Sequence, residues 1–141
     1  MKLKTIFIIV IFGWALSTSA HGDKDKKHND TMAKSYIVSP KDGDTVDRTF
    51  KVFFGLKGMG VSPAGVEKVN SGHHHLMIDS KEMPDLTKPL DKTVKHFGGG
   101  QTETTLTLAP GNHTLQLILA DHKHLPHKPA VISKKITITV K

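Results

Sequence analysis

The sequence predicts an all-β domain, an immunoglobulin-like antiparallel β-sandwich, on three observations. Every second residue from Phe50 to Leu56 is apolar, and Leu106 and Leu108 share one face of 102–108, which is the period of a strand with one buried face. Turn-forming residues, such as Pro40 and Pro110-Gly111-Asn112, separate the short apolar stretches. No segment repeats its apolar residues with a helical period. Short strands joined by such turns are typical of a sandwich or barrel, and we predict the sandwich.

The expected elements follow the apolar stretches in order. We predict strands at 36–38, 50–56, 74–79, 102–108 and 114–120, and one long strand at 131–140. In the last strand the apolar side chains of 132, 136, 138 and 140 should mostly share a face. Residues 58–72 and 121–129 are expected as loops, and 80–100 as a long connection without a clear period.

The first residues have the layout of a secretory signal peptide. Lys2 and Lys4 precede an apolar run over 6–16, and small residues follow up to Ala20. The run is too short for a transmembrane helix, which needs about 20 residues. We therefore expect 1–20 to be cleaved, leaving no transmembrane segment, and the mature protein to be periplasmic or secreted. Polar, charged residues 21–34 predict a disordered leader, and 35–141 the sandwich domain.

Composition excludes several classes of site and partner. The chain has no cysteine, which excludes disulfides, cysteine zinc sites and the thiolate of blue copper. Its net charge of +7 would fall to +5 on loss of Lys2 and Lys4. Arg48 is the only arginine and aromatic residues are few, so no nucleic-acid partner is expected.

Ten histidines are the most informative feature of the composition. Successive side chains of a strand point to opposite faces, so His73, His75 and Met77 should share one face. His74 should share the other face with Leu76, which is the natural core face. Imidazole suits copper, zinc and nickel, and thioether favours cuprous copper, so the first face offers a metal site.

Further histidines could complete this site if the topology brings them to the same end of the sandwich. In a plain up-and-down order the 121–129 loop would lie a strand length away from His73. If 80–100 crosses the sandwich once more, both regions and the histidine at 96 meet. The predicted metal ligands are His73, His75, His96, His124, His127 and Met77. The alternative is that these histidines hydrogen-bond loop backbone, as expected for His113.

Several motifs occur in an order that resembles a known family. They include Gly72-His73-His74-His75-Leu76, the run 96–104 (HFGGGQTET) and the run 124–127 (HLPH). Over roughly residues 70 to 140 the chain resembles an uncharacterised family of exported bacterial proteins with a domain of unknown function. The resemblance implies no activity. It implies that the histidines at 73, 74, 75, 96, 124 and 127 belong to the family pattern.

A shorter stretch is similar to a second group. The start at His21 after cleavage, followed by the run 39–46, is similar to periplasmic copper-resistance sandwich proteins. The spacing between His21 and this run is longer here.

The sequence thus favours an exported, non-catalytic protein that binds copper or zinc through clustered histidines. The alternative is a structural or interaction module of the cell envelope, with a protein partner and no metal. We do not expect an enzyme, because the sequence has no nucleophile elbow, zinc-protease motif or phosphate loop.

Overall fold

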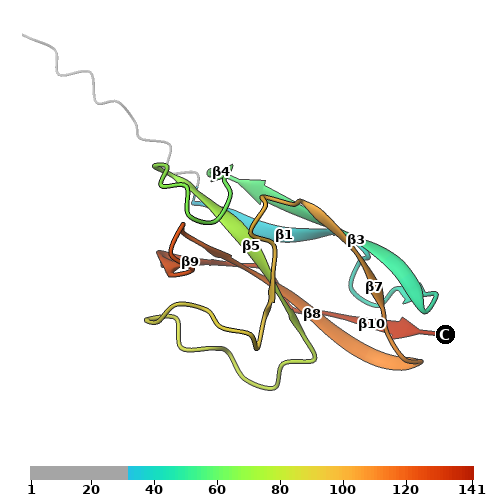
Figure 1. The fold of residues 1–141 in the computed structure, drawn as a ribbon. Helices are drawn as coiled ribbons and strands as arrows, with labels where there is room; N and C mark the ends of the chain where they lie inside the picture. Colours follow the sequence, from blue (N-terminus) through green and yellow to red (C-terminus); the bar gives the residue numbers. More distant parts are fainter. Residues whose placement is uncertain (1–31) are drawn as a thin grey trace, which may run out of the picture.

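The computed structural model describes residues 32–141 as an assembly of strands, without a helix in this part of the chain (Figure 1). The strands are β1 (Lys34–Ser39), β2 (Thr45–Val46), β3 (Thr49–Lys57), β4 (Gly60–Val61), β5 (Ser71–Ile78), β6 (Lys95–His96), β7 (Glu103–Thr107), β8 (Gly111–Ala120), β9 (Pro126–Ile132) and β10 (Ile136–Val140). Among residues 32–141, no helix is long and apolar enough to cross a membrane.

The strands form two sheets. One has the order β1-β3-β7, and the other has the order β2-β10-β8-β5-β4, with β6 also paired to β5 and β9 also paired to β8. Most pairings are antiparallel, and the short β2 and β4 pair in parallel. The predicted fold class, an immunoglobulin-like β-sandwich, is confirmed.

The main core fills the space between the two sheets. The alternation predicted for 50–56 is confirmed, because Val52 and Phe54 are buried while Lys51 and Phe53 are exposed. The core is completed by Leu76, Phe97, Leu106, Leu115, Leu117, Ile136, Ile138 and Val140. Strands β3, β8 and β10 each contribute every second residue, as a sandwich requires.

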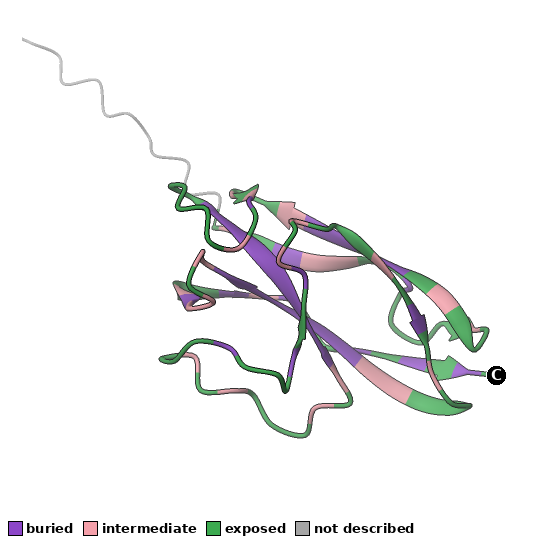
Figure 2. Ribbon diagram, in the orientation of Figure 1, coloured by how far each residue is buried: buried purple, intermediate pink, exposed green. Residues whose placement is uncertain are grey.

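Strand β5 is buried on both faces, unlike a typical sandwich strand (Figure 2). On the outer face of the large sheet, Met77 and Ile118 form a second apolar cluster with Leu90 and Val94 from the long connection. The segment between β5 and β6 therefore covers this face and excludes water from it. This second core shields one side of the site described below.

The predicted single strand at 131–140 is wrong, because β9 and β10 are separate strands. Ile132 pairs with Ile118 and Ile136 pairs with Leu115. The chain between Ile132 and Ile136 therefore has one residue more than the segment of β8 that it faces. A one-residue bulge exchanges the faces of a strand. Ile132 consequently packs on the outer cluster, while Ile136 packs in the main core.

Ser133 stabilises this bulge. Its Oγ accepts a hydrogen bond from the Leu117 N–H at 2.8 Å and donates one to the Lys134 carbonyl at 2.8 Å. The predicted loop at 121–129 is likewise corrected, since β9 already begins at Pro126. Strand β1 begins at Lys34, the last residue of the expected leader. The expected signal peptide, and the leader up to residue 31, lie outside the described residues.

Candidate metal centre

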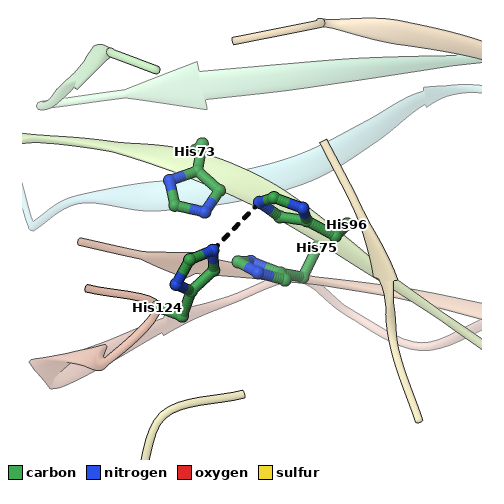
Figure 3. Close-up of side chains that lie close together, drawn as sticks. All are labelled: His73, His75, His96 and His124. Atoms are coloured by element: carbon green, nitrogen blue, oxygen red, sulfur yellow. Dashed lines mark hydrogen bonds between the residues drawn. The ribbon is translucent and has the colours of Figure 1, made fainter. Parts of the chain in front are cut away.

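Four histidines converge on the outer face of the large sheet. His73, His75, His96 and His124 each offer a ring nitrogen, and these four atoms all lie within 4.8 Å of one another. Their ring centroids are 4.7 to 5.8 Å apart. Figure 3 shows the rings pointing toward a common centre, with His73 and His75 rising from one strand. This group brings together four of the six predicted ligands.

The strand register explains three of the four positions. Alternation along β5 places His73 and His75 on the outer face and His74 on the inner face. In the antiparallel β5–β6 pair, His96 lies directly opposite His75, so both side chains are on the same face. His73 pairs with Ala120, the last residue of β8, which brings the next loop to the site.

His124 reaches the site through a tight turn organised by Asp121. The Asp121 carboxylate Oδ1 accepts hydrogen bonds from the Lys123 N–H at 2.8 Å and the Leu125 N–H at 3.0 Å. The Asp121 N–H donates to the Leu125 carbonyl at 2.9 Å, which closes the loop. Within this turn His124 takes a φ of 66°, a left-handed conformation that non-glycine residues rarely adopt. The cost of this conformation is offset by the bonds that Asp121 makes.

His96 depends on the glycines that follow it. A Cβ at position 98 would clash with His96 Cε1 and lie 2.6 Å from its Nε2, so only glycine lets the imidazole occupy this place. The Gly98 carbonyl accepts from the Ala64 N–H at 2.8 Å, and Phe97 donates to the His74 carbonyl at 3.1 Å. These bonds hold the chain after β6 against β5 and the 62–66 loop.

The two histidines of β5 are completely enclosed, whereas the other two histidines of the group face the solvent. His73 and His75 are 0% and 1% exposed, while His96 is exposed and His124 is half-buried. Both ring nitrogens of His73, and Nδ1 of His75, have no hydrogen-bond partner within the described residues. Buried polar atoms are rarely left unpaired in proteins, and such atoms frequently mark a functional group.

Burial and mutual repulsion keep the imidazoles of His73, His75 and His96 neutral near pH 7. Burial, followed by repulsion from His96 and His124, lowers the pKa of His73 to about 4. Burial and the neighbouring histidines lower the pKa of His75 to about 3. Burial and His124 also lower the pKa of His96. A neutral imidazole is the form that binds a metal, so these three ligands are ready to bind at neutral pH.

The dimensions of the group suit a transition-metal ion. Nε2 of His96 and Nε2 of His124 lie 3.2 Å apart (Figure 3). Zinc–nitrogen bonds of about 2.0–2.1 Å arranged tetrahedrally place ligand atoms about 3.4 Å apart. Four imidazoles without a thiolate match the ligand preference of zinc and copper. The residues present therefore fit such an ion once their ligand atoms, which lie within 4.8 Å of one another, draw in to about this separation.

The other two predicted ligands have different surroundings. Met77 shares the outer face with His75, but it is buried in the apolar cluster with Leu90 and Val94. His127 is outside the group of four. Its buried Nε2 would lie 2.9 Å from a Cβ placed on Gly72. This nitrogen has no hydrogen-bond partner among the described residues. Gly72 is on the inner face of β5, so His127 approaches the strand from the side opposite the four rings.

The remaining described histidines have other surroundings. His74 is completely buried in the main core, 5.3 Å from the Phe54 ring centroid, as expected from alternation. His113 is structural, as expected: its Nδ1 is 2.7 Å from the Asp79 carboxylate and its Nε2 is 2.8 Å from the Ala109 carbonyl. Nε2 of His122 lies 3.9 Å from the Glu67 carboxylate.

Two supporting residues did not emerge from the sequence. Asp121 shapes the turn and also counters charge at the site, since its carboxylate favours protonation of His73. Burial raises the pKa of Asp121, but N–H donors from Leu125 and Lys123 and nearby histidines outweigh it, so the pKa lies below its usual value. The aspartate at the start of a short loop was a signal for such a turn. Gly98 is the second of these residues, because a run of three glycines signals a turn but does not show that the His96 ring must lie against one of them.

Comparison with known proteins identifies the family. No curated protein matches the chain. An endo-β-1,4-mannanase from Thermotoga petrophila is similar at a TM-score of 0.46 and 15% identity, over 77% of this chain and 20% of that chain, so this chain spans only a fifth of its length. The fibronectin(III)-like modules of CbhA from Clostridium thermocellum are similar at a TM-score of 0.42 and 14% identity, over 76% of this chain and 95% of that chain. A family model described as a domain of unknown function, DUF4399, matches residues 52–141, and the chain belongs to this family.

Proposed function

We propose that this protein is an exported, non-catalytic metal-binding protein that holds copper or zinc with His73, His75, His96 and His124. The observation that carries the proposal is the meeting of four imidazole nitrogens within 4.8 Å of one another. These nitrogens come from three segments far apart in the sequence.

The unpaired nitrogens of the site favour a metal over a purely structural role. A histidine that supports a loop should resemble His113, whose two ring nitrogens both have hydrogen-bond partners. His74 shows that an imidazole in the apolar core can lack such partners, but His73 differs from it because it also lies beside three other imidazoles. His73 is completely buried and neither of its ring nitrogens has a partner among the described residues. An unpaired buried polar group costs about 1–3 kcal/mol, and a bound cation would remove that cost.

The number of ligands supports binding without catalysis. Catalytic zinc sites keep three protein ligands and leave a fourth position for water or substrate, whereas closed sites use four. His73, His75, His96 and His124 supply four. Divalent copper binds nitrogen ligands more tightly than zinc does, so availability in the compartment decides which ion occupies the site.

The proposed compartment rests on the first twenty residues, which have the layout of a cleaved signal peptide. We propose that the mature protein resides in the periplasm or outside the cell. The similarity of the 39–46 region to copper-resistance sandwich proteins agrees with a role in handling copper there.

The test is direct measurement of bound metal. The protein is expressed without a tag, exported, and analysed by mass spectrometry at neutral pH. We expect nearly one copper or zinc ion per chain, and its loss when His73 and His75 are both replaced by alanine. His122→Ala, a histidine outside the group of four, is the control and should keep the metal. Metal-free protein that gains no thermal stability from added copper or zinc would refute the proposal.

A further inference from the structure

We propose that the metal centre exchanges its ion through the His96–His124 side, with these two ligands released first and His73 and His75 last. This inference rests on the proposed function and adds the route by which the ion is passed on. The class of acceptor is a partner site that offers competing nitrogen or sulfur ligands.

The four ligands divide into an inner and an outer pair by burial. His73 and His75 are enclosed, and the strand that carries them is paired on both edges, to β8 on one side and to β4 and β6 on the other. Neither ring can leave the site without disrupting the centre of the large sheet. The inner pair therefore forms a fixed base for the ion.

The outer pair lies on weaker supports. His96 ends a strand of only two residues and its side chain is exposed, although the next residue, Phe97, is buried in the main core. His124 lies in a five-residue turn and is half-buried. Exposed side chains on short elements move at lower free energy than those enclosed at the centre of a sheet, so these two rings can turn out of the site while the sheet stays intact.

Alternative partners for the outer rings lower the cost of releasing the ion. When the ion is absent, Nε2 of His96 and Nε2 of His124 can share a hydrogen bond at 3.2 Å, and both rings contact solvent. His73 has no such substitute. An incoming ligand can thus form its bond to the ion as the bond to His96 or His124 breaks, without any change in oxidation state.

Stopped-flow measurement of zinc release tests this order. The zinc-loaded protein is mixed with increasing concentrations of a chromogenic zinc chelator, and equilibrium dialysis gives the amount of zinc bound to each variant. The variants are His96→Ala, His124→Ala, His75→Ala and the control His122→Ala. Near-ultraviolet circular dichroism verifies that each variant is folded.

We expect the release rate of the wild type to rise with chelator concentration. His96→Ala and His124→Ala should still load zinc but release it at least about tenfold faster, a change comparable to loss of a supporting metal contact. His75→Ala should fail to load zinc, and His122→Ala should behave as the wild type.

Two results would overturn the proposed order. One is a release rate that does not depend on chelator concentration, since the protein would then have to open first. The other is unchanged release from both His96→Ala and His124→Ala. A wild type that binds no zinc or copper in dialysis would instead refute the proposed function, so the two failures are distinguishable.

Discussion

At the scale of single residues, three consecutive histidines meet two different environments. Alternation sends His73 and His75 outward into a polar group of rings and sends His74 inward against Phe54. Neither ring nitrogen of His74 has a hydrogen-bond partner within residues 32–141. The main core therefore contains an imidazole that must stay neutral.

Replacing His74 by leucine should make the metal-free protein more resistant to acid. Burial lowers the pKa of His74 in the folded protein to about 4, from the 6.5 of a histidine that is not buried. The unfolded chain therefore takes up the proton first. The stability linked to this group is complete above pH 6.5 and is lost as the pH falls toward 4.

Urea unfolding of both proteins at about pH 7.5 and about pH 5 measures this effect, with chelator present to keep the metal out. The leucine variant should gain about 2 kcal/mol relative to wild type between the two conditions, given a shift of this size. Parallel pH dependence of the two proteins would contradict a neutral, buried His74.

Asp121 combines two roles that substitution can separate. Asparagine retains an oxygen that can accept from the Lys123 and Leu125 N–H groups, but it removes the negative charge. Four neutral imidazoles leave the charge of a divalent ion uncompensated, so this nearby carboxylate should favour binding. We expect Asp121→Asn to weaken zinc affinity about tenfold and Asp121→Ala, which also loses the turn, about a hundredfold.

Competition with a chelator of known affinity gives these values. Asp85 provides a matched control, because its carboxylate organises an exposed turn in the same way, by accepting from the Thr87 N–H at 3.0 Å. Asp85→Asn should leave zinc affinity unchanged. Equal effects of Asp121→Asn and Asp121→Ala would assign the whole role to charge, and no effect of either would exclude both roles.

At the scale of elements, pairing between strands decides which side chains meet. The two-residue strand β6 is held to β5 opposite His75, which fixes His96 beside it. Farther along the same sheet, the extra residue at 133–135 exchanges the face of the chain between β9 and β10. Short irregular features of this kind set the positions of side chains that strand periodicity alone would misplace.

The effect of adding a side chain to the glycine turn after β6 should depend on which glycine is replaced. Gly98→Ala introduces a Cβ that meets the His96 ring, whereas a Cβ on Gly99 meets only the flexible side chain of Gln101. We expect Gly98→Ala to reduce zinc affinity about tenfold or more, as for a displaced metal ligand, and Gly99→Ala to leave it nearly unchanged. Isothermal titration calorimetry compares the two. Equal affinities would show that the ring can rotate away without loss of binding.

At the scale of the whole molecule, the site ties the long connection and the 121–125 turn to the large sheet. The Leu90 N–H donates to the His124 carbonyl at 2.8 Å, and the Gly65 N–H donates to the His122 carbonyl at 2.9 Å. Three surface segments are thus joined around the four histidines, while the sheet β1-β3-β7 lies on the far side of the main core.

Zinc binding should therefore protect one side of the molecule selectively. Amides that exchange through local opening should exchange more slowly in residues 90–100 and 121–125 on adding zinc and change little in β1, β3 and β7, whereas amides that exchange only through global unfolding should slow in every strand. Global stability should rise by about 2.7 kcal/mol at a free zinc concentration of about 100 times the dissociation constant. His73→Ala with His75→Ala should abolish both effects. Equal slowing of the locally opening amides of β1, β3 and β7 would indicate binding that is not localised at this site.

The sequence by itself determined the fold class and the local geometry of the histidine strand. The alternation at 50–56 and 102–108 has the period of two that is typical of a sheet with one buried face. The same period sends the side chain of His74 to the face opposite those of His73 and His75. Both are local properties, because they depend only on the direction of successive side chains.

Only the tertiary structure decided which histidines meet. The pairing of Ala120 with His73 and of His96 with His75 joins segments that are distant along the chain, and no local pattern encodes such a register. The same reason explains why His127, close to His124 in sequence, lies outside the group, and why Met77 packs with apolar residues. Convergence of ligands depends on sheet order, and sheet order depends on packing of the whole domain.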